Sequence, residues 1–111
     1  MNAAERHRNR QRRRSLEFAR EIRTRRAELR ASIEAGDAAL QWTIAEPPSW
    51  MQTVKVLDAL PWVPGIGSVA AEEIVDSLAL DPWAEFGRLN VRERLALMHE
   101  LDARVKDGRI A

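Results

Sequence analysis

The amino-acid sequence predicts an all-α protein in which a long basic helix precedes a small helical domain. Apolar residues recur about every three to four positions through most of the chain, which is the spacing of amphipathic helices. The alternation of a half-buried strand does not occur, and no pair of segments is typical of a β-hairpin. With 111 residues, of which 45% are hydrophobic, the chain is long enough for one modest core. We therefore expect a basic arm and helix over residues 1–35 and a helical domain over residues 36–111.

Charge divides the chain in the same way. Residues 1–30 contain eleven arginines and four glutamates, whereas residues 31–111 contain seven basic and thirteen acidic residues. Balances of +7 and −6 are typical of a basic arm for a polyanion on a mildly acidic body. Nearly all the basic residues are arginines, which suit bidentate contacts with phosphate and guanine. Residues 1–14 contain nothing that could be buried, so we expect them to be disordered or a frayed helix until a polyanion orders them.

A long helix is predicted over residues 15–35. Its apolar residues are four or seven positions apart, which places them on one stripe: Phe18, Ile22, Leu29 and Ile33. At about 100° per residue, four basic residues lie on one flank of this stripe and are candidate polyanion contacts: Arg20, Arg23, Arg26 and Arg30. We expect Gly36 to end the helix, because glycine readily adopts the left-handed conformation that follows a helix.

Shorter helices are predicted in the body. Asp37 is expected to cap a helix over residues 38–46, which Pro47 and Pro48 stop. Ser49 is expected to cap a third helix, with one face formed by Trp50, Val54 and Leu57. After a tight connection over residues 61–67, a fourth helix is predicted from about Ser68 to Leu78. Its inward residues are Ala71, Ile74, Val75 and Leu78.

The last helix follows a turn that begins at Asp81-Pro82 and becomes helical through Phe86. Asn90 and Glu93 form a capping-box pattern at its start. Its expected buried stripe is Val91, Leu95, Met98, Leu101 and Val105, and Gly108 is expected to end it. We also expect the tryptophans to be core residues, although Trp62 and Trp83 lie beside turns where they could instead contact a nucleic acid. The two tryptophans more plainly assigned to the core are Trp42 and Trp50.

The most informative pattern lies within residues 57–75, where Pro64-Gly65-Ile66-Gly67 separates a helix end from a helix start. The glycines permit positive φ angles and the close approach of another backbone, and Ile66 can pack between the two helices. The N–H groups of about residues 67–70 have no helical partners and point along the helix dipole. Such a helix start binds anions and suits a phosphate, to which the Ser68 hydroxyl can add a donor.

This segment resembles the helix-hairpin-helix, or helix-two-turns-helix, motif, in which the hairpin binds a phosphate of DNA. Leu60, Ala71 and Ile74 also stand where the motif expects them. The alternative is a purely structural turn, since any helical hairpin can use proline and glycine. The resemblance implies DNA contacts at Pro64, Gly65, Ile66, Gly67, Ser68 and Val69.

The wider chain, over about residues 15–105, resembles the actinobacterial integration host factor family. The similarity is clearest in segments 56–60, 64–74, 78–82 and 89–97. The resemblance implies a small, non-enzymatic, nucleoid-associated protein of the cytoplasm. It implies binding of double-stranded DNA with little sequence preference, bending or compaction of that DNA, and support of phage integration. Recombination or nucleoid proteins would be further partners.

The chain departs from this family beside the hairpin. Family members usually have lysine or arginine just after it, whereas this chain has Ser68 and Ala70, followed by Glu72 and Glu73. These changes weaken the electrostatics of the hairpin and shift the expected affinity towards the arginine-rich helix. Three arginines at the entry of the last helix are further candidate DNA contacts, with a merely solvated helix face as the alternative: Arg88, Arg92 and Arg94.

Other functions find little support in the sequence. Cysteine is missing, which excludes disulfides and cysteine-based sites, and the two histidines lack the spacing of metal ligands. No apolar run reaches the roughly 18 residues of a membrane span. We therefore expect no enzymatic activity, cofactor, metal, small-molecule substrate or membrane partner. Two alternatives stay open: an RNA- or ribosome-associated binder, and a protein–protein adaptor with a solubilising arginine helix.

Overall fold

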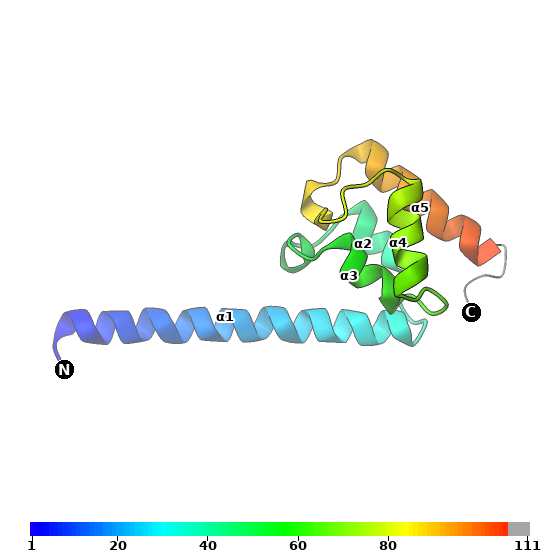
Figure 1. The fold of residues 1–111 in the computed structure, drawn as a ribbon. Coiled ribbons are helices and arrows are strands. Elements are labelled where there is room, and N and C mark those ends of the chain that lie inside the picture. The colour runs from blue at the N-terminus through cyan, green and yellow to red at the C-terminus, as the bar shows by residue number, and fades with distance from the viewer. Residues whose placement is uncertain (107–111) are drawn as a thin grey trace.

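The computed structural model describes residues 1–106 and is all-α, with a long helix beside a cluster of short ones (Figure 1). The molecule measures 64 × 27 × 23 Å, and the long helix runs along its longest dimension. The α-helices are α1 (Ala3–Glu34), α2 (Leu40–Ala45), α3 (Val56–Ala59), α4 (Ser68–Ser77) and α5 (Val91–Lys106). Three single 3₁₀ turns join them: η1 (Ser49–Met51), η2 (Leu60–Trp62) and η3 (Phe86–Arg88). The predicted fold class is confirmed, while the expected helix end at Gly108 lies outside the described residues.

Helix α1 begins much earlier than the sequence led us to expect. Asn2 and Glu5 form a capping box, in which the Glu5 N–H donates to Asn2 Oδ1 at 2.8 Å. Neither proline nor glycine occurs before Gly36, so nothing interrupts the helix that this cap starts. Of the two states expected for residues 1–14, a disordered segment is therefore wrong, because residues 3–14 are helical. The predicted end is confirmed, because Gly36 has a φ of +81° directly after the last turn.

The apolar stripe of α1 is buried progressively towards the helix end. Ile33 is buried in the core, Leu29 and Ile22 are partly covered, and Phe18 is 65% exposed. Only the C-terminal part of α1 packs on the other helices, while its N-terminal part extends past them (Figure 1). The division of the chain at residue 35 stays a prediction, since α1 contributes Ile33 to the core.

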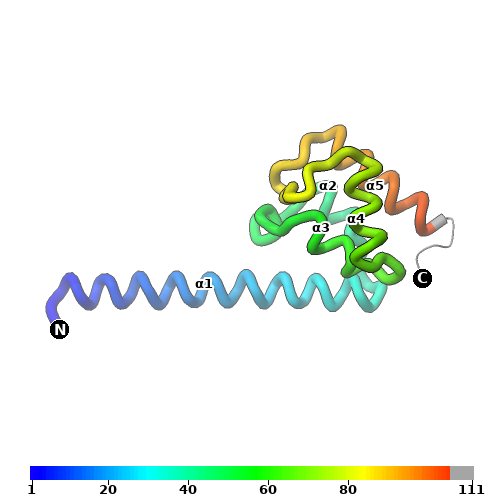
Figure 2. The backbone as a smooth tube through the Cα atoms, viewed as in Figure 1, coloured from blue at the N-terminus to red at the C-terminus, as the bar shows by residue number. Residues whose placement is uncertain are grey.

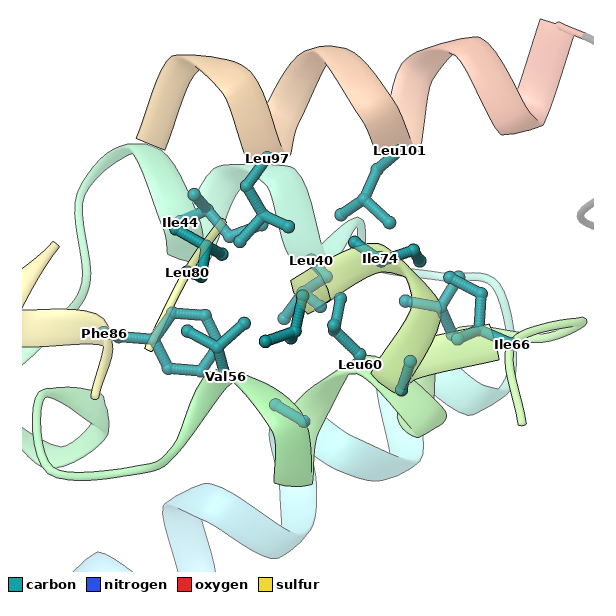
Figure 3. Close-up of a cluster of buried hydrophobic side chains, with 14 of the residues drawn as sticks. Leu40, Ile44, Val56, Leu60, Ile66, Ile74, Leu80, Phe86, Leu97 and Leu101 are labelled. Atoms are coloured by element: carbon teal, nitrogen blue, oxygen red, sulfur yellow. The ribbon is translucent and has the colours of Figure 1, made fainter. Parts of the chain in front are cut away.

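The core lies between α2, α3, α4 and α5 (Figure 3). Helix α4 buries Ala71, Ile74 and Val75, as its spacing predicts. The largest fully buried side chain is Phe86, which comes from η3. Labelled members of the core come from α2, α3, η2, α4, η3 and α5 and from the segments that join them: Leu40, Ile44, Val56, Leu60, Ile66, Ile74, Leu80, Phe86, Leu97 and Leu101.

Two predicted helix starts in the body are wrong. Helix α2 begins at Leu40 with Ala39 as its N-cap and without a side-chain cap, so Asp37 does not cap it. Ser49 starts only the single turn η1, and α3 begins separately at Val56. The intervening backbone pairs instead with a distant segment: the Phe86 N–H donates to the Val54 carbonyl, and the Val56 N–H donates to the Ala84 carbonyl. These long-range hydrogen bonds take the place of those of a continuous helix, and no local sequence pattern predicts them.

The expected buried stripe of α5 is also wrong in part. The capping box is confirmed, because the Glu93 N–H donates to Asn90 Oδ1 and the Asn90 N–H donates to Glu93. However, Leu97 and Leu101 are buried, while Val91 is 71% and Leu95 is 60% exposed. The reason is the rotation of the helix, which turns Arg94 inward to donate to backbone carbonyls. Met98 is partly buried and Val105 is exposed.

The tryptophans divide into two pairs. Trp50 and Trp62 are partly buried and pack against the core. Trp42 is 74% exposed and Trp83 is 70% exposed, so the expectation that they are core residues is wrong. In α2 the inward positions belong to Leu40, Thr43 and Ile44, which leaves Trp42 on the outer side. Trp83 lies on a surface turn, where the Lys55 ammonium is 4.8 Å from the centre of its ring.

Candidate nucleic-acid interface

The hairpin is formed by α3 and η2 on one side and α4 on the other. The Val63 N–H donates to the Leu60 carbonyl and the Ile66 N–H donates to the Val63 carbonyl, which closes the chain into two successive turns. Gly65 lies between them with a φ of +90°, a conformation that L side chains rarely adopt. Ile66 is 3% exposed and packs into the core, as its position between the glycines predicts. Figure 2 shows this turn between α3 and the start of α4.

The start of α4 presents free backbone donors to solvent. Gly67 is the N-cap, no side chain caps the helix, and the first hydrogen bond is from the Ala71 N–H to the Gly67 carbonyl, at 3.0 Å. Among the described residues, no hydrogen bond uses the N–H groups of Ser68, Val69 and Ala70. Ser68 and Val69 are exposed, so an anion can reach these donors.

The two glycines of the turn have different roles. Gly67 has φ −90° and ψ −175°, an extended conformation that any residue can adopt. A Cβ atom at Gly67 would meet no atom within 4 Å. Only Gly65 therefore needs the conformational freedom of glycine. The fold does not require a glycine at position 67, and the space beside its backbone is open.

The side chains around the hairpin do not add positive charge. Glu72 and Glu73 are exposed on α4, and so is Asp76 one turn later. Helix α4 contains no basic residue. Any attraction for an anion at the hairpin therefore comes from backbone N–H groups and the helix dipole.

The four candidate arginines of α1 are not equivalent. Arg20 and Arg23 are exposed and form no ion pair among residues 1–106. Arg30 pairs with Glu34 along the helix surface. Arg26 is partly buried and donates to the Trp50 carbonyl at 2.6 Å and to the Thr53 hydroxyl at 3.0 Å. Two of the four side chains are therefore free for an external partner, and Arg26 is engaged within the fold.

The three candidate arginines near α5 also differ. Arg92 is exposed, and the Arg88 side chain is 82% exposed with Glu85 Oε1 at 3.4 Å. Arg94 is partly buried, and its guanidinium donates to the Leu89 carbonyl at 3.0 Å and to the Ile44 carbonyl at 3.1 Å. Arg94 thus joins the start of α5 to α2, and its engaged N–H groups do not face an external ligand.

The predicted site residues do not form one continuous patch. The hairpin lies beside the C-terminal end of α1, where Ile33, Gly36, Val63 and Pro64 line a shared groove of about 170 Å³. The arginine-rich N-terminal half of α1 extends away from it (Figure 2). Segment 82–92, which contains Arg88 and Arg92, lies on the side of the body away from α1 (Figure 1).

The structure also adds basic residues that the site prediction did not name individually. Residues 1–14 contain six arginines, and α1 presents all of them on an exposed, continuous helix: Arg6, Arg8, Arg10, Arg12, Arg13 and Arg14. The signal that could have found this helix is the capping-box pattern of Asn2 and Glu5, which is the same pattern as at Asn90 and Glu93. Within the described residues, no helix is long and apolar enough to cross a membrane, and no three metal-binding side chains come together.

Comparison with known proteins identifies the family of this chain. No family model matches the chain. The integration host factor of Mycolicibacterium smegmatis is 33% identical over 94 residues, which are 83% of this chain and 90% of that protein. The solved structure of sIHF bound to an 8 bp palindromic DNA superimposes with a TM-score of 0.69 at 26% identity, covering 76% of this chain and 97% of that one. The chain therefore belongs to the actinobacterial integration host factor family.

Proposed function

We propose that this protein is a non-enzymatic, architectural DNA-binding protein that contacts duplex DNA mainly through phosphates. The observation that supports this most directly is the uncapped start of α4 behind the Pro64–Gly67 hairpin, in a chain similar to a structure solved with DNA. A phosphate would accept hydrogen bonds from the N–H groups of Ser68, Val69 and Ala70. Because such contacts do not read base edges, we expect little sequence preference.

Helix α1 would supply most of the electrostatic affinity. Each phosphate that an arginine neutralises releases counterions, and most arginines of α1 are exposed on the helix surface. The proposed contacts are Arg20, Arg23 and Arg30, together with the arginines of residues 1–14. Arg26 and Arg94 are left out, because their guanidinium groups are engaged within the fold.

The length of α1 favours DNA longer than a minimal site. Its 32 residues extend over about 48 Å, at about 1.5 Å per residue. A duplex of 8 bp, as in the sIHF complex, is about 27 Å long. A duplex that contacts both the hairpin and the arginines near residue 6 therefore has to be longer than that. Contacts at well-separated points are what bending a duplex requires.

Arg88 and Arg92 are proposed as secondary contacts. They lie on the side of the body away from α1, so one duplex that touches both regions has to curve, and two straight duplexes would be bridged. Either arrangement bends or compacts DNA, which is the role we propose in the nucleoid of the cytoplasm and in the support of phage integration.

A substitution at Gly67 tests the hairpin, because it is expected to keep or raise protein stability while it lowers the affinity for DNA. A Cβ atom at Gly67 meets no atom within 4 Å, and Gly67→Glu puts a carboxylate at a helix start, which stabilises a helix by about 0.3–1 kcal/mol. The same carboxylate repels a phosphate from the three free N–H groups. We expect the melting temperature to hold or rise while affinity for a duplex of about 20 bp falls at least tenfold, by the scale of a lost charge-assisted contact.

Gly67→Ala is the matched control, because it fills the same open space without charge. We expect it to weaken binding less than Gly67→Glu. Fluorescence polarisation with duplex DNA, duplex RNA and single strands at several salt concentrations measures both variants. Equal binding by Gly67→Glu and the native chain would exclude the hairpin as a contact. Preference for RNA would favour a ribosome-associated role, and no binding to duplex DNA at low salt would favour a protein adaptor.

A further inference from the structure

Arg26 forms side-chain hydrogen bonds that connect α1 to η1 and to the loop that follows η1. Its Nε donates to the Trp50 carbonyl at 2.6 Å, and its Nη2 donates to Thr53 Oγ1 at 3.0 Å. The Trp50 carbonyl accepts no backbone hydrogen bond within the described residues, so Arg26 satisfies a group that would otherwise lack a partner. The planar guanidinium can hold both acceptors at once, which a single ammonium group cannot do with the same geometry.

The loop that Arg26 contacts is itself fastened to the rest of the body. The Gly87 N–H donates to the Gln52 carbonyl at 2.9 Å, and the Phe86 N–H donates to the Val54 carbonyl at 3.1 Å. The approach at Gly87 is so close that a Cβ atom there would lie 2.8 Å from Gln52 Cβ. Because Phe86 is fully buried, the loop at residues 50–54 is fixed to the core. Arg26 therefore connects α1 to a rigid support.

Apolar packing alone does not hold α1 at this position. A groove of about 500 Å³ lies between α1 and η1, lined by Phe18, Ile22 and Trp50 among others. Phe18 is mostly exposed, so the apolar contact between these elements is incomplete. Close packing resumes only at Leu29 and Ile33, near the helix end. Arg26 is thus the contact nearest the free half of α1 that combines burial with specific hydrogen bonds.

We infer that Arg26 is a positioning residue that sets the direction of the arginine-rich helix relative to the hairpin. This inference rests on the proposed function for its consequence, since direction matters only if one DNA molecule contacts both regions. The charge of Arg26 is used inside the protein, whereas the charges of Arg20 and Arg23 face solvent. Loss of Arg26 would free the N-terminal half of α1 to tilt on the Leu29–Ile33 contact.

Arg23→Ala is a matched control for Arg26→Ala. Both variants remove one arginine from α1, but only Arg26 contacts the body. The chain has no cysteine, so spin labels can be attached at Gln11→Cys on α1 and Glu73→Cys on α4, both exposed positions. Pulsed electron paramagnetic resonance on the free protein then measures the distribution of distances between the two labels. Melting curves identify any variant that does not fold.

We expect Arg26→Ala to increase the population of other helix directions by about tenfold, the scale of one charge-assisted hydrogen bond, while Arg23→Ala leaves the distribution unchanged. Arg26→Lys keeps the charge but has one donor nitrogen in place of the two that Arg26 uses, so we expect a partial broadening with an unchanged salt dependence of DNA binding. For DNA binding, we expect Arg23→Ala to reduce the slope of log affinity against log salt by about 0.9. Arg26→Ala should mainly reduce DNA bending, which is measured by energy transfer between the ends of a labelled duplex.

Two results would overturn the positioning role. One is that Arg26→Ala and Arg23→Ala give identical distance distributions. The other is that Arg26→Lys gives a distribution as broad as that of Arg26→Ala while neither variant loses DNA bending. The distance measurement uses no DNA, so its result is independent of whether the protein binds DNA. A broadened distribution with no DNA binding by the native chain would overturn the proposed function and retain the mechanical role of Arg26. If Arg26→Ala does not fold, Arg26→Lys decides the question.

Discussion

Helix α1 and the helical body are held in place by different forces. Every buried core side chain except Ile33 comes from residues 40–101. The body is therefore stabilised by the burial of apolar surface. Most of α1 buries no apolar surface. Its stability depends on its capping box, on good helix-forming residues and on ion pairs such as Arg25 Nη2–Glu21 Oε1 at 3.1 Å.

The difference separates folding from binding along the chain. The body contains the buried core side chains and the backbone donors of the hairpin, but the net charge of −5 over residues 36–111 would repel DNA. Helix α1 has the opposite charge and little role in the core. Changes in α1 should therefore alter affinity with little effect on stability, whereas changes in the core should do the reverse. Three experiments test this separation.

Replacing the six arginines of residues 1–14 with glutamine should have the largest effect. The slope of log affinity against log salt should become shallower by up to about 5, since each phosphate contact contributes about 0.9. The melting temperature should hold, because these side chains are exposed. Titrations of labelled duplex at several salt concentrations provide the measurement. An unchanged slope would mean that the arm does not contact DNA.

Phe86→Ala should destabilise the body by about 3–5 kcal/mol, because it removes a fully buried aromatic side chain from the core. Phe18→Ala is the matched change on α1 and should cost less than about 0.5 kcal/mol, because Phe18 is 65% exposed. Urea unfolding followed by tryptophan fluorescence measures both. Similar losses for the two variants would show that α1 packs on the body more tightly than the comparison implies.

Arg92→Ala should have the smallest effect, a reduction of the salt slope by about 0.9 with no change in stability. Arg104→Ala is its control on the same helix, because Arg104 is partly buried and pairs with Glu100 at 3.1 Å. The same titrations compare the two. An equal effect of both variants would argue that the loss reflects overall charge and not a contact at Arg92.

Much of the fold could be predicted because local chemistry determines it. The end of α1 at Gly36, the hairpin, the burial of Ile66 and the capping box of Asn90 and Glu93 all depend on residues within a few positions of one another. The same capping-box pattern occurs at Asn2 and Glu5, where it predicts the true start of α1, but the expectation for residues 1–14 did not use it. The hairpin residues were likewise predictable, since the free N–H groups follow from where α4 begins.

Other predictions failed because distant contacts outweigh local patterns. The spacing of Val91 and Leu95 fits a buried stripe, but α5 is rotated so that Leu97 and Leu101 face the core and Arg94 donates to the Ile44 carbonyl. Trp42 is hydrophobic, but the inward positions of the short helix α2 were already taken by Leu40, Thr43 and Ile44. Segment 84–87 ends the helix expected after Ser49, by pairing with residues 52–56.

The sequence by itself determined the helical class, the charge division, the hairpin and the family resemblance, because periodicity, glycine placement and charge are properties of neighbouring residues. Only the tertiary structure decided which arginines are free. Arg26 and Arg94 look like their neighbours in the sequence, yet each donates to a backbone carbonyl far along the chain, at separations of 24 and 50 residues. A guanidinium group can donate to a phosphate or to a carbonyl, so its partner depends on which acceptors the fold brings within reach.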